Sequence, residues 1–167
     1  FVLIDGNFWL FSCYYATAAM GNLMVNKDGV PTNAVYGFAN RLESLLRKNP
    51  EYIVVAFDAK GKTFRSELLE NYKGTRKETP EELICQFSMV REYLRAHNIP
   101  YLELEGYEGD DIIGTLSKKA KDAGLKVAIY TNDKDMMQLV NESVYQYKKP
   151  QKSDEYEIIT PESFYEK

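Results

Sequence analysis

Aspartate follows each of three apolar runs that predict buried strands. The three pairs are residues 1–4 with Asp5, residues 52–57 with Asp58, and residues 126–130 with Asp133. In an open parallel sheet the carboxyl ends of the strands meet at one edge, and ligands bind in the crevice there. We therefore expect these three carboxylates to lie close together.

Four more carboxylates are expected at this edge. Glu108, Asp110 and Asp111 stand where a loop enters a helix, and Asp135 lies two residues past Asp133. The whole chain has a net charge of −4. Seven ionised carboxylates carry about −7, which leaves about +3 on the rest of the chain. The acidity therefore belongs to the predicted site, and the remaining charge is compatible with a nucleic-acid partner.

The predicted cluster has the ligand chemistry of a hard metal ion. Carboxylates this close raise one another's pKa values unless a cation neutralises them. The chain has one histidine, His97, and two distant cysteines, Cys13 and Cys85, so a zinc site of the His/Cys type cannot be assembled. Oxygen ligands favour Mg²⁺ or Mn²⁺, and two such ions can stabilise the attacking and leaving oxygens of a phosphoryl displacement. The structural alternative is that these carboxylates cap turns and complement a helix dipole.

A basic segment follows directly after Asp58. It contains Lys60, Lys62, Arg65, Lys73, Arg76 and Lys77, interleaved with the aromatic residues Phe64 and Tyr72. Lys and Arg suit phosphates, and aromatic rings suit unstacked bases. The alternative is a solvated connection. Beside an acidic crevice, a basic segment can hold a phosphodiester that the carboxylates alone would repel.

Strand and helix patterns alternate along the chain, which predicts an α/β fold with a mostly parallel central sheet. Further strands are expected at residues 100–104, and as a pair at residues 144–147 and 156–159. The expected helices are residues 35–46, a helix from the capping box Thr79-Pro80-Glu81-Glu82 to about Leu94, one from about Asp110 to Ala120 capped by Gly124, a short one after Asp133, and one that starts at Thr160. The apolar stretch from Phe8 to Met20 resembles a signal peptide, but Asp5 stands where a basic region belongs.

Length and composition limit the class of protein. The 167 residues suit one domain, or a domain that has lost a flank, and 44% hydrophobic residues can supply a core. No run approaches the roughly 18 apolar residues of a membrane span. Cysteines without a CxxC pattern favour a reducing cytoplasm. The chain opens on Phe1, and its last predicted helix has only a few residues to run, so we expect it to be truncated.

Several ordered motifs resemble a known family. The match consists of Leu3-Ile4-Asp5-Gly6-Asn7, Pro31-Thr32-Asn33-Ala34-Val35-Tyr36-Gly37-Phe38, Ala56-Phe57-Asp58, Thr63-Phe64-Arg65, Tyr72-Lys73, Glu105 through Leu116, and Asp133-Lys134-Asp135. These motifs are similar to the 5'-3' exonuclease domain of bacterial DNA polymerase I, within the 5'-nuclease and flap-endonuclease superfamily. The resemblance implies a PIN-like α/β core with helices on both faces and a basic helical arch after Asp58. It also implies a metal-dependent hydrolase that cuts DNA at 5' ends and 5' flaps, as in primer removal during replication and repair.

The resemblance also implies roles for individual residues. Asp5, Asp58, Glu108 and Asp110 would hold a first Mg²⁺ or Mn²⁺ ion; Asp110, Asp133 and Asp135 would contribute to a second, with Asp111 in or next to the shell. Lys73 and Arg76 match basic positions of the arch that contacts the scissile phosphate, which makes Lys73 a catalytic candidate with Asp110. Arg65, Tyr72 and Tyr36 are the other DNA-binding candidates.

The chain departs from the family pattern in three places. Gly109 stands where the family commonly has Ala, and Asn132 where Gly or Ala usually precedes the Asp-Lys-Asp motif. The helix-hairpin-helix-like DNA-binding region normally follows the point where this chain stops. We therefore interpret residues 1–167 as the N-terminal catalytic domain of a cytoplasmic, monomeric enzyme whose second metal site is incomplete here. A polymerase domain on the same chain is possible but does not follow from these motifs.

Three other functions are compatible with parts of the pattern. A phosphoacceptor receiver domain also gathers aspartates at strand ends, but the basic insertion after Asp58 fits it poorly. A haloacid-dehalogenase-type phosphatase requires an aspartate two residues after Asp5, where this chain has Asn7. The third alternative is a nucleic-acid-binding module without competent catalysis.

Overall fold

One six-stranded sheet organises the chain. The computed structural model describes residues 1–18, 21, 23–61, 63–68, 78–150, 153 and 155–164. The strands are β1 (Val2–Asp5), β2 (Ile53–Ala56), β3 (Tyr101–Leu102), β4 (Val127–Tyr130), β5 (Val144–Lys148) and β6 (Glu157–Ile159), in the spatial order β3-β2-β1-β4-β5-β6. β6 is antiparallel to β5, and all other pairings are parallel. The predicted α/β fold with a mostly parallel sheet is confirmed.

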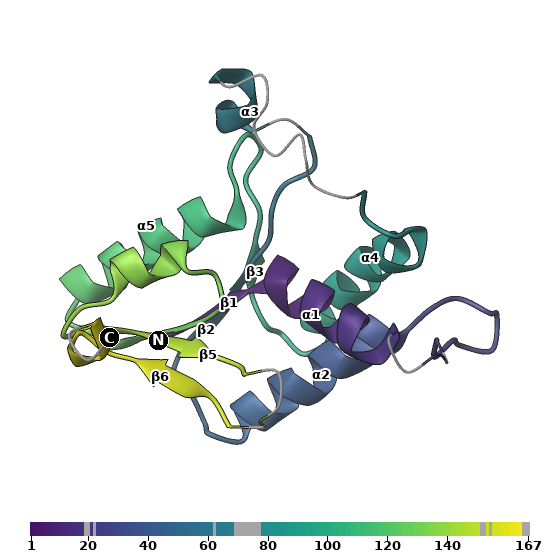
Figure 1. Ribbon diagram of the computed structural model, residues 1–167, viewed down its shortest axis with the longest axis horizontal. Helices are drawn as coiled ribbons and strands as arrows, with labels where there is room; N and C mark the ends of the chain where they lie inside the picture. The colour runs from purple at the N-terminus through teal and green to yellow at the C-terminus, as the bar shows by residue number, and fades with distance from the viewer. Residues whose placement is uncertain are drawn as a thin grey trace.

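Helices cover both faces of this sheet (Figure 1). The helices α1 (Gly6–Ala18), α2 (Asn33–Leu46) and α4 (Glu81–Ala96) share one hydrophobic cluster with one face. The helix α5 (Gly109–Asp122) and the 3-10 helix η1 (Asp135–Leu139) share a second cluster with the other. The short α3 (Phe64–Leu68) is drawn away from the sheet, and η2 (Glu162–Phe164) follows β6. The predicted helix after Thr160 is described only as this 3-10 turn.

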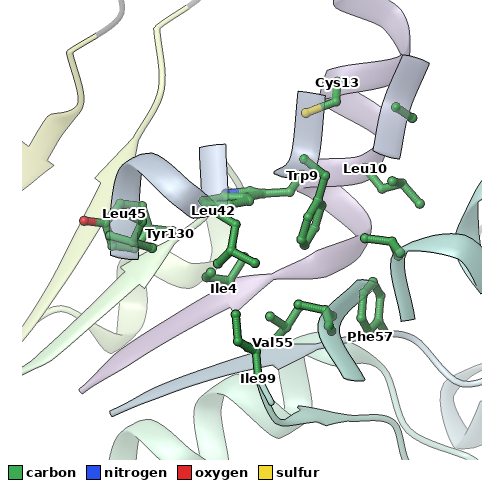
Figure 2. Packing of buried hydrophobic residues seen from close by; sticks show 14 of the residues in the cluster. Ile4, Trp9, Leu10, Cys13, Leu42, Leu45, Val55, Phe57, Ile99 and Tyr130 are labelled. Carbon is green, nitrogen blue, oxygen red and sulfur yellow. The ribbon is translucent and has the colours of Figure 1, made fainter. Parts of the chain in front are cut away.

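β1 is buried on both faces, as a central parallel strand should be. Ile4 faces the α1 and α2 side, whereas Leu3 belongs to the cluster under α5. Figure 2 shows Ile4 pointing into the same layer as Trp9 of α1 and Leu42 of α2. Both of its neighbours, β2 and β4, run parallel to it, so β1 ends between two strands that end at the same edge.

The apolar stretch after Asp5 is a helix that sequence reasoning did not identify. α1 follows β1 without a loop, and its residues Trp9, Leu10 and Cys13 are buried. Gly6 permits this tight junction, because a Cβ there would lie 2.5 Å from the Phe57 ring. The helix carries few charged or strongly polar residues, so it lacks the polar stripe by which an amphipathic helix is recognised.

Two of the predicted helix ends can be compared with the structure. α5 ends as expected: Gly124 has a φ of 79°, and the Leu125 N–H donates to the Ala120 carbonyl, which is a Schellman motif. The predicted capping box of α4 is wrong. Pro80 lies outside the helix with a ψ of 139°, and no side chain of the described residues caps the first turn. Its carbonyl instead accepts the Leu83 N–H, so the helix begins one residue later than predicted.

The predicted basic arch after Asp58 can be followed only in part. Residues 62 and 69–77 lie outside the described residues, so the structure describes α3 alone from this segment. Among the described residues, no helix is both long and apolar enough to span a bilayer.

Candidate active site

Five of the seven predicted carboxylates line one pocket. Asp5 is paired with Ala56 of β2, and Ile4 is paired with Tyr130 of β4. The three strands therefore end side by side at one edge of the sheet. The pocket at this edge has a volume of about 590 Å³. Its acidic lining consists of Asp5, Asp58, Glu108, Asp110 and Asp133. The parallel register therefore brings together side chains from four separate parts of the chain.

Asp5 joins the end of β1 to the beginning of α1. Its carboxylate accepts the Phe8 N–H at 2.9 Å, as an N-cap does, and the Thr131 hydroxyl at 2.8 Å. The side chain is buried, and burial raises its pKa to about 6; the nearby Asp58 and Asp133 act in the same direction, while the two hydrogen bonds oppose it. The Phe8 N–H at the start of α1 therefore partly offsets the desolvation of the Asp5 carboxylate.

Asp58 is held by two neighbours that come from other elements. The Asn7 amide donates to it at 3.3 Å and accepts the Asp58 N–H at 3.0 Å. The Gly109 N–H at the start of α5 donates to the same carboxylate at 2.7 Å. A Cβ at position 109 would lie 3.3 Å from Asp58 Oδ1, which is tight, so Gly lets α5 approach closely. Sequence reasoning used Asn7 as part of the family motif and to argue against a phosphatase, and it missed this contact.

Asp110 interacts electrostatically with four other carboxylates of the cluster. Its pKa is raised to about 7, mainly by burial and in addition by Asp5, Asp133, Asp58 and Glu108. This side chain on the first turn of α5 therefore lies within electrostatic reach of carboxylates from β1, β2 and β4.

Asp111 and Asp135 border a neighbouring hollow of about 440 Å³, which shares Glu108 and Asp110 with the first. The Arg65 guanidinium donates to both carboxylate oxygens of Asp111 at 2.7 Å, and one of its nitrogens lies 3.8 Å from Glu108. Asp111 also accepts the Glu108 N–H at 3.0 Å, which caps α5. In this structure Arg65, predicted to contact DNA, therefore neutralises two predicted metal ligands.

Asp133 is held by Thr131 and Gln146, which sequence reasoning did not identify as site residues, and by the predicted Asp135. The Asp133 N–H donates to the Thr131 hydroxyl at 3.1 Å, and its carboxylate accepts the Asp135 N–H at 2.9 Å. The buried Gln146 amide donates to the Asp133 carbonyl at 2.7 Å. Only the polarity of Gln146 within an apolar strand could have signalled this role.

Asn132, one of the departures from the family pattern, links two strand ends. Its amide donates to the Lys149 carbonyl at 2.8 Å, and its oxygen accepts the Lys149 N–H at 2.7 Å. These two bonds tie the segment after β4 to the segment after β5.

The donor chemistry of the pocket fits a hard cation. Its polar lining consists of carboxylate, amide and hydroxyl oxygens, and the pKa values of Asp5 and Asp110 are raised where a cation would lower them. Within the described part of the chain, no three Asp, Glu, His or Cys side chains are arranged closely enough to hold an ion as they stand. An ion that keeps part of its water shell needs only one or two of these carboxylates as direct ligands.

The predicted DNA-binding residues are only partly described. Tyr36 is exposed on α2, while the aromatic residues that line the acidic pocket are Phe8, Phe11 and Phe87. Tyr72, Lys73 and Arg76 lie outside the described residues, so their assignment stays a prediction.

Relatives of the chain are found by sequence and by structure. It is 42% identical over 167 residues to DNA polymerase I of Bacillus caldotenax, covering 99% of this chain and 19% of that protein. It is 41% identical over 143 residues to a 5'-3' exonuclease of Aquifex aeolicus, covering 85% of this chain and 48% of that protein. The chain thus spans about a fifth of the first relative and about half of the second.

Solved structures show the same fold. A T5 5'-exonuclease with bound divalent zinc ions has a TM-score of 0.70 at 20% identity, covering 99% of this chain and 59% of that one. A bacteriophage T5 flap endonuclease in complex with DNA and metal ions has a TM-score of 0.68 at 19% identity, with the same coverage.

The family model described as "5'-3' exonuclease, N-terminal resolvase-like domain" matches residues 1–167. This match sets aside the receiver domain and the dehalogenase-type phosphatase. With the strand-end carboxylates and the parallel sheet, it shows that the chain belongs to the family of 5'-3' exonuclease N-terminal, resolvase-like domains.

Proposed function

We propose that this chain is the N-terminal catalytic domain of a divalent-metal-dependent 5'-3' exonuclease and 5'-flap endonuclease. It would hydrolyse phosphodiester bonds of DNA in replication and repair, including primer removal. The observation that supports this most directly is the pocket in which Asp5, Asp58, Glu108, Asp110 and Asp133 converge. Burial and neighbouring carboxylates raise the pKa values of two of them, Asp5 and Asp110, and such shifts in a pocket are typical of functional sites.

The metal would be Mg²⁺ or Mn²⁺, with two ions in the complete enzyme. We assign Asp5, Asp58, Glu108 and Asp110 to the first ion and Asp110, Asp133 and Asp135 to the second. Bound ions would supply polarisation of the phosphoryl oxygen and charge stabilisation on both sides of the scissile bond. The T5 exonuclease with zinc ions and the T5 flap endonuclease with metal ions support a metal requirement.

The chain's own residues then have distinct tasks. Asn7 and the Gly109 N–H orient the Asp58 carboxylate toward the pocket, and Thr131 orients Asp5. Lys73 and Arg76 of the basic segment would hold the phosphodiester against this acidic surface, since phosphate would otherwise be repelled.

The substrate and partners are inferred from the relatives. DNA with 5' ends or 5' flaps is the proposed substrate, as the T5 flap endonuclease complex with DNA supports. The polymerase I relatives support a polymerase domain on the same chain. We further propose that the enzyme acts in the cytoplasm as a monomer.

Cleavage of a labelled 5'-flap duplex, resolved on a gel with Mg²⁺ or Mn²⁺, tests this function. The matched substrates are the same duplex without a flap and a closed circle with no 5' end. We expect cleavage at the flap, loss of cleavage with EDTA, and an intact circle. Equal cutting of the circle would contradict a 5' nuclease.

A nucleic-acid-binding module is the second candidate. It is favoured by the absence, among the described residues, of a carboxylate trio already arranged around an ion position. The same experiment separates the two, because a binding module shifts the flap duplex in a native gel with either metal but leaves it uncut.

A further inference from the structure

The middle of β5 carries a buried amide where an aliphatic side chain would be expected. Gln146 is fully buried and is paired with Ile129 of β4 and Ile159 of β6. It shares a face of the strand with Val144, two residues earlier, which belongs to the hydrophobic cluster under α5. An apolar residue would fill this space without a polar group to satisfy.

Both donors of this amide are used on one short segment. Gln146 Nε2 donates to the Thr131 carbonyl at 3.0 Å and to the Asp133 carbonyl at 2.7 Å. Its Oε1 is buried and has no hydrogen-bond partner among the described residues. The reverse amide orientation would place an oxygen against two carbonyl oxygens, so the neighbours determine which atom faces the segment. An unpaired buried oxygen is unfavourable. The amide nevertheless fixes residues 131–133 through its two hydrogen bonds.

Residues 131–133 position two carboxylates, Asp5 after β1 and Asp133 after β4. The Thr131 hydroxyl donates to Asp5 at the end of β1 and accepts the Asp133 N–H. A continuous set of hydrogen bonds therefore runs from Gln146 through Thr131 and Asp133 to Asp5. Displacement of the two carbonyls would move both carboxylates that line this side of the pocket.

We infer that Gln146 is a positioning residue for the acidic site: it holds residues 131–133 so that Asp133 and, through Thr131, Asp5 face the same pocket. The inference rests on the proposed metal-dependent function. Groups that orient metal ligands from behind change metal affinity about 10–100-fold when they are removed.

The Gln146→Met variant tests this role, because Met has similar length and no donor. Titration of the chain with Mn²⁺ in a calorimeter measures binding without a substrate. We expect Mn²⁺ affinity to fall about tenfold or more at a temperature where the variant is folded by circular dichroism. Val144→Ala is the matched control, because it also removes buried contacts from β5 but leaves the amide intact. It should lower the thermal midpoint and retain Mn²⁺ affinity.

A second pair of variants keeps the test decisive if Gln146→Met does not fold. Thr131→Val removes the hydroxyl and should weaken Mn²⁺ binding, whereas Thr131→Ser keeps the hydroxyl and should restore it. Mn²⁺ affinity within twofold of wild type in Gln146→Met, or equal affinity in the two Thr131 variants, would overturn the positioning role alone. If the wild-type chain itself does not bind Mn²⁺, both the proposed function and this inference are wrong.

Discussion

The two acidic hollows at the carboxyl edge of the sheet differ in how their charge is balanced. In the smaller one, Arg65 neutralises Asp111 through two hydrogen bonds of 2.7 Å. In the larger one, no Lys or Arg of the described residues contributes to the lining, and the pKa values of Asp5 and Asp110 are raised to about 6 and about 7. Aspartate is therefore paired with an arginine in the smaller hollow, whereas Asp5 and Asp110 of the larger one have no Lys or Arg beside them in the described part of its lining.

This difference distinguishes two uses of a carboxylate. Asp111 holds Arg65 and caps α5 through the Glu108 N–H, which is structural work that needs no ion. Asp5 is buried and Asp110 is half-buried, both near other carboxylates, so a bound cation would favour their charged forms. At this edge of the sheet, a bound cation would therefore stabilise the carboxylates of the larger pocket more than those of the smaller hollow.

The largest effect is expected from substitution of Asp110, which lines the larger acidic pocket. Asp110→Asn should abolish Mg²⁺-dependent flap cleavage, a fall of at least about 10³-fold in single-turnover rate, because it removes a charged group shared by both proposed ions. Its thermal midpoint should be unchanged or higher, since repulsion among the carboxylates is relieved. Undiminished cleavage by this variant would remove the site assignment.

The next effect concerns Lys73 and Arg76, which we propose as the cationic counterpart of that pocket. Lys73→Ala should lower the single-turnover rate and flatten the plot of log affinity against log salt by about 0.7 to 0.9, with stability within about 0.5 kcal/mol of wild type. Arg76→Ala should show the binding effect more than the rate effect. A wild-type rate together with an unchanged salt slope in Lys73→Ala would show that the segment does not hold the phosphate.

Removal of the Arg65 side chain tests the role of the arginine in the smaller hollow. Arg65→Ala leaves Asp111 without its cation, so we expect a loss of about 1–2 kcal/mol in the free energy of unfolding by urea denaturation. Arg65→Lys should recover only part of it, because an ammonium cannot bind both carboxylate oxygens in the same plane. The opposite result, unchanged stability with a flatter salt slope for DNA binding, would assign Arg65 to the substrate instead.

The last expected effect is a pH dependence of stability in metal-free buffer. Asp5 and Asp110 titrate at about 6 and about 7 in the folded chain but near 3.8 when unfolded. Between about pH 4 and 7 the folded state therefore binds more protons than the unfolded state, and stability falls as pH rises. Urea denaturation should show a smaller fall in Asp110→Asn, and Mg²⁺ should reduce the fall in wild type. An identical pH profile in variant and wild type would mean that Asp110 is not held at a raised pKa.

Much of the site could be predicted because its positions are set by local pattern. Apolar runs identify β1, β2 and β4, and the rule for parallel strands places Asp5, Asp58 and Asp133 at one edge without knowledge of any contact. α1 was missed because a helix with apolar residues on most sides has no polar stripe to identify it. The α4 start was misplaced because Pro80 suits both the residue before a helix and its first turn.

The sequence by itself determined where strands occur along the chain, the burial of β1 and the strand ends at which acids accumulate, since these depend on neighbours along the chain. Only the tertiary structure decided which carboxylates are paired with a cation or a hydrogen-bond donor. The Arg65 pair with Asp111 spans 46 residues, and the Thr131 bond to Asp5 spans 126. Such pairings depend on which segments the sheet register brings together and on how far each side chain is removed from water. The balance of charge at the site is therefore a property of the folded chain.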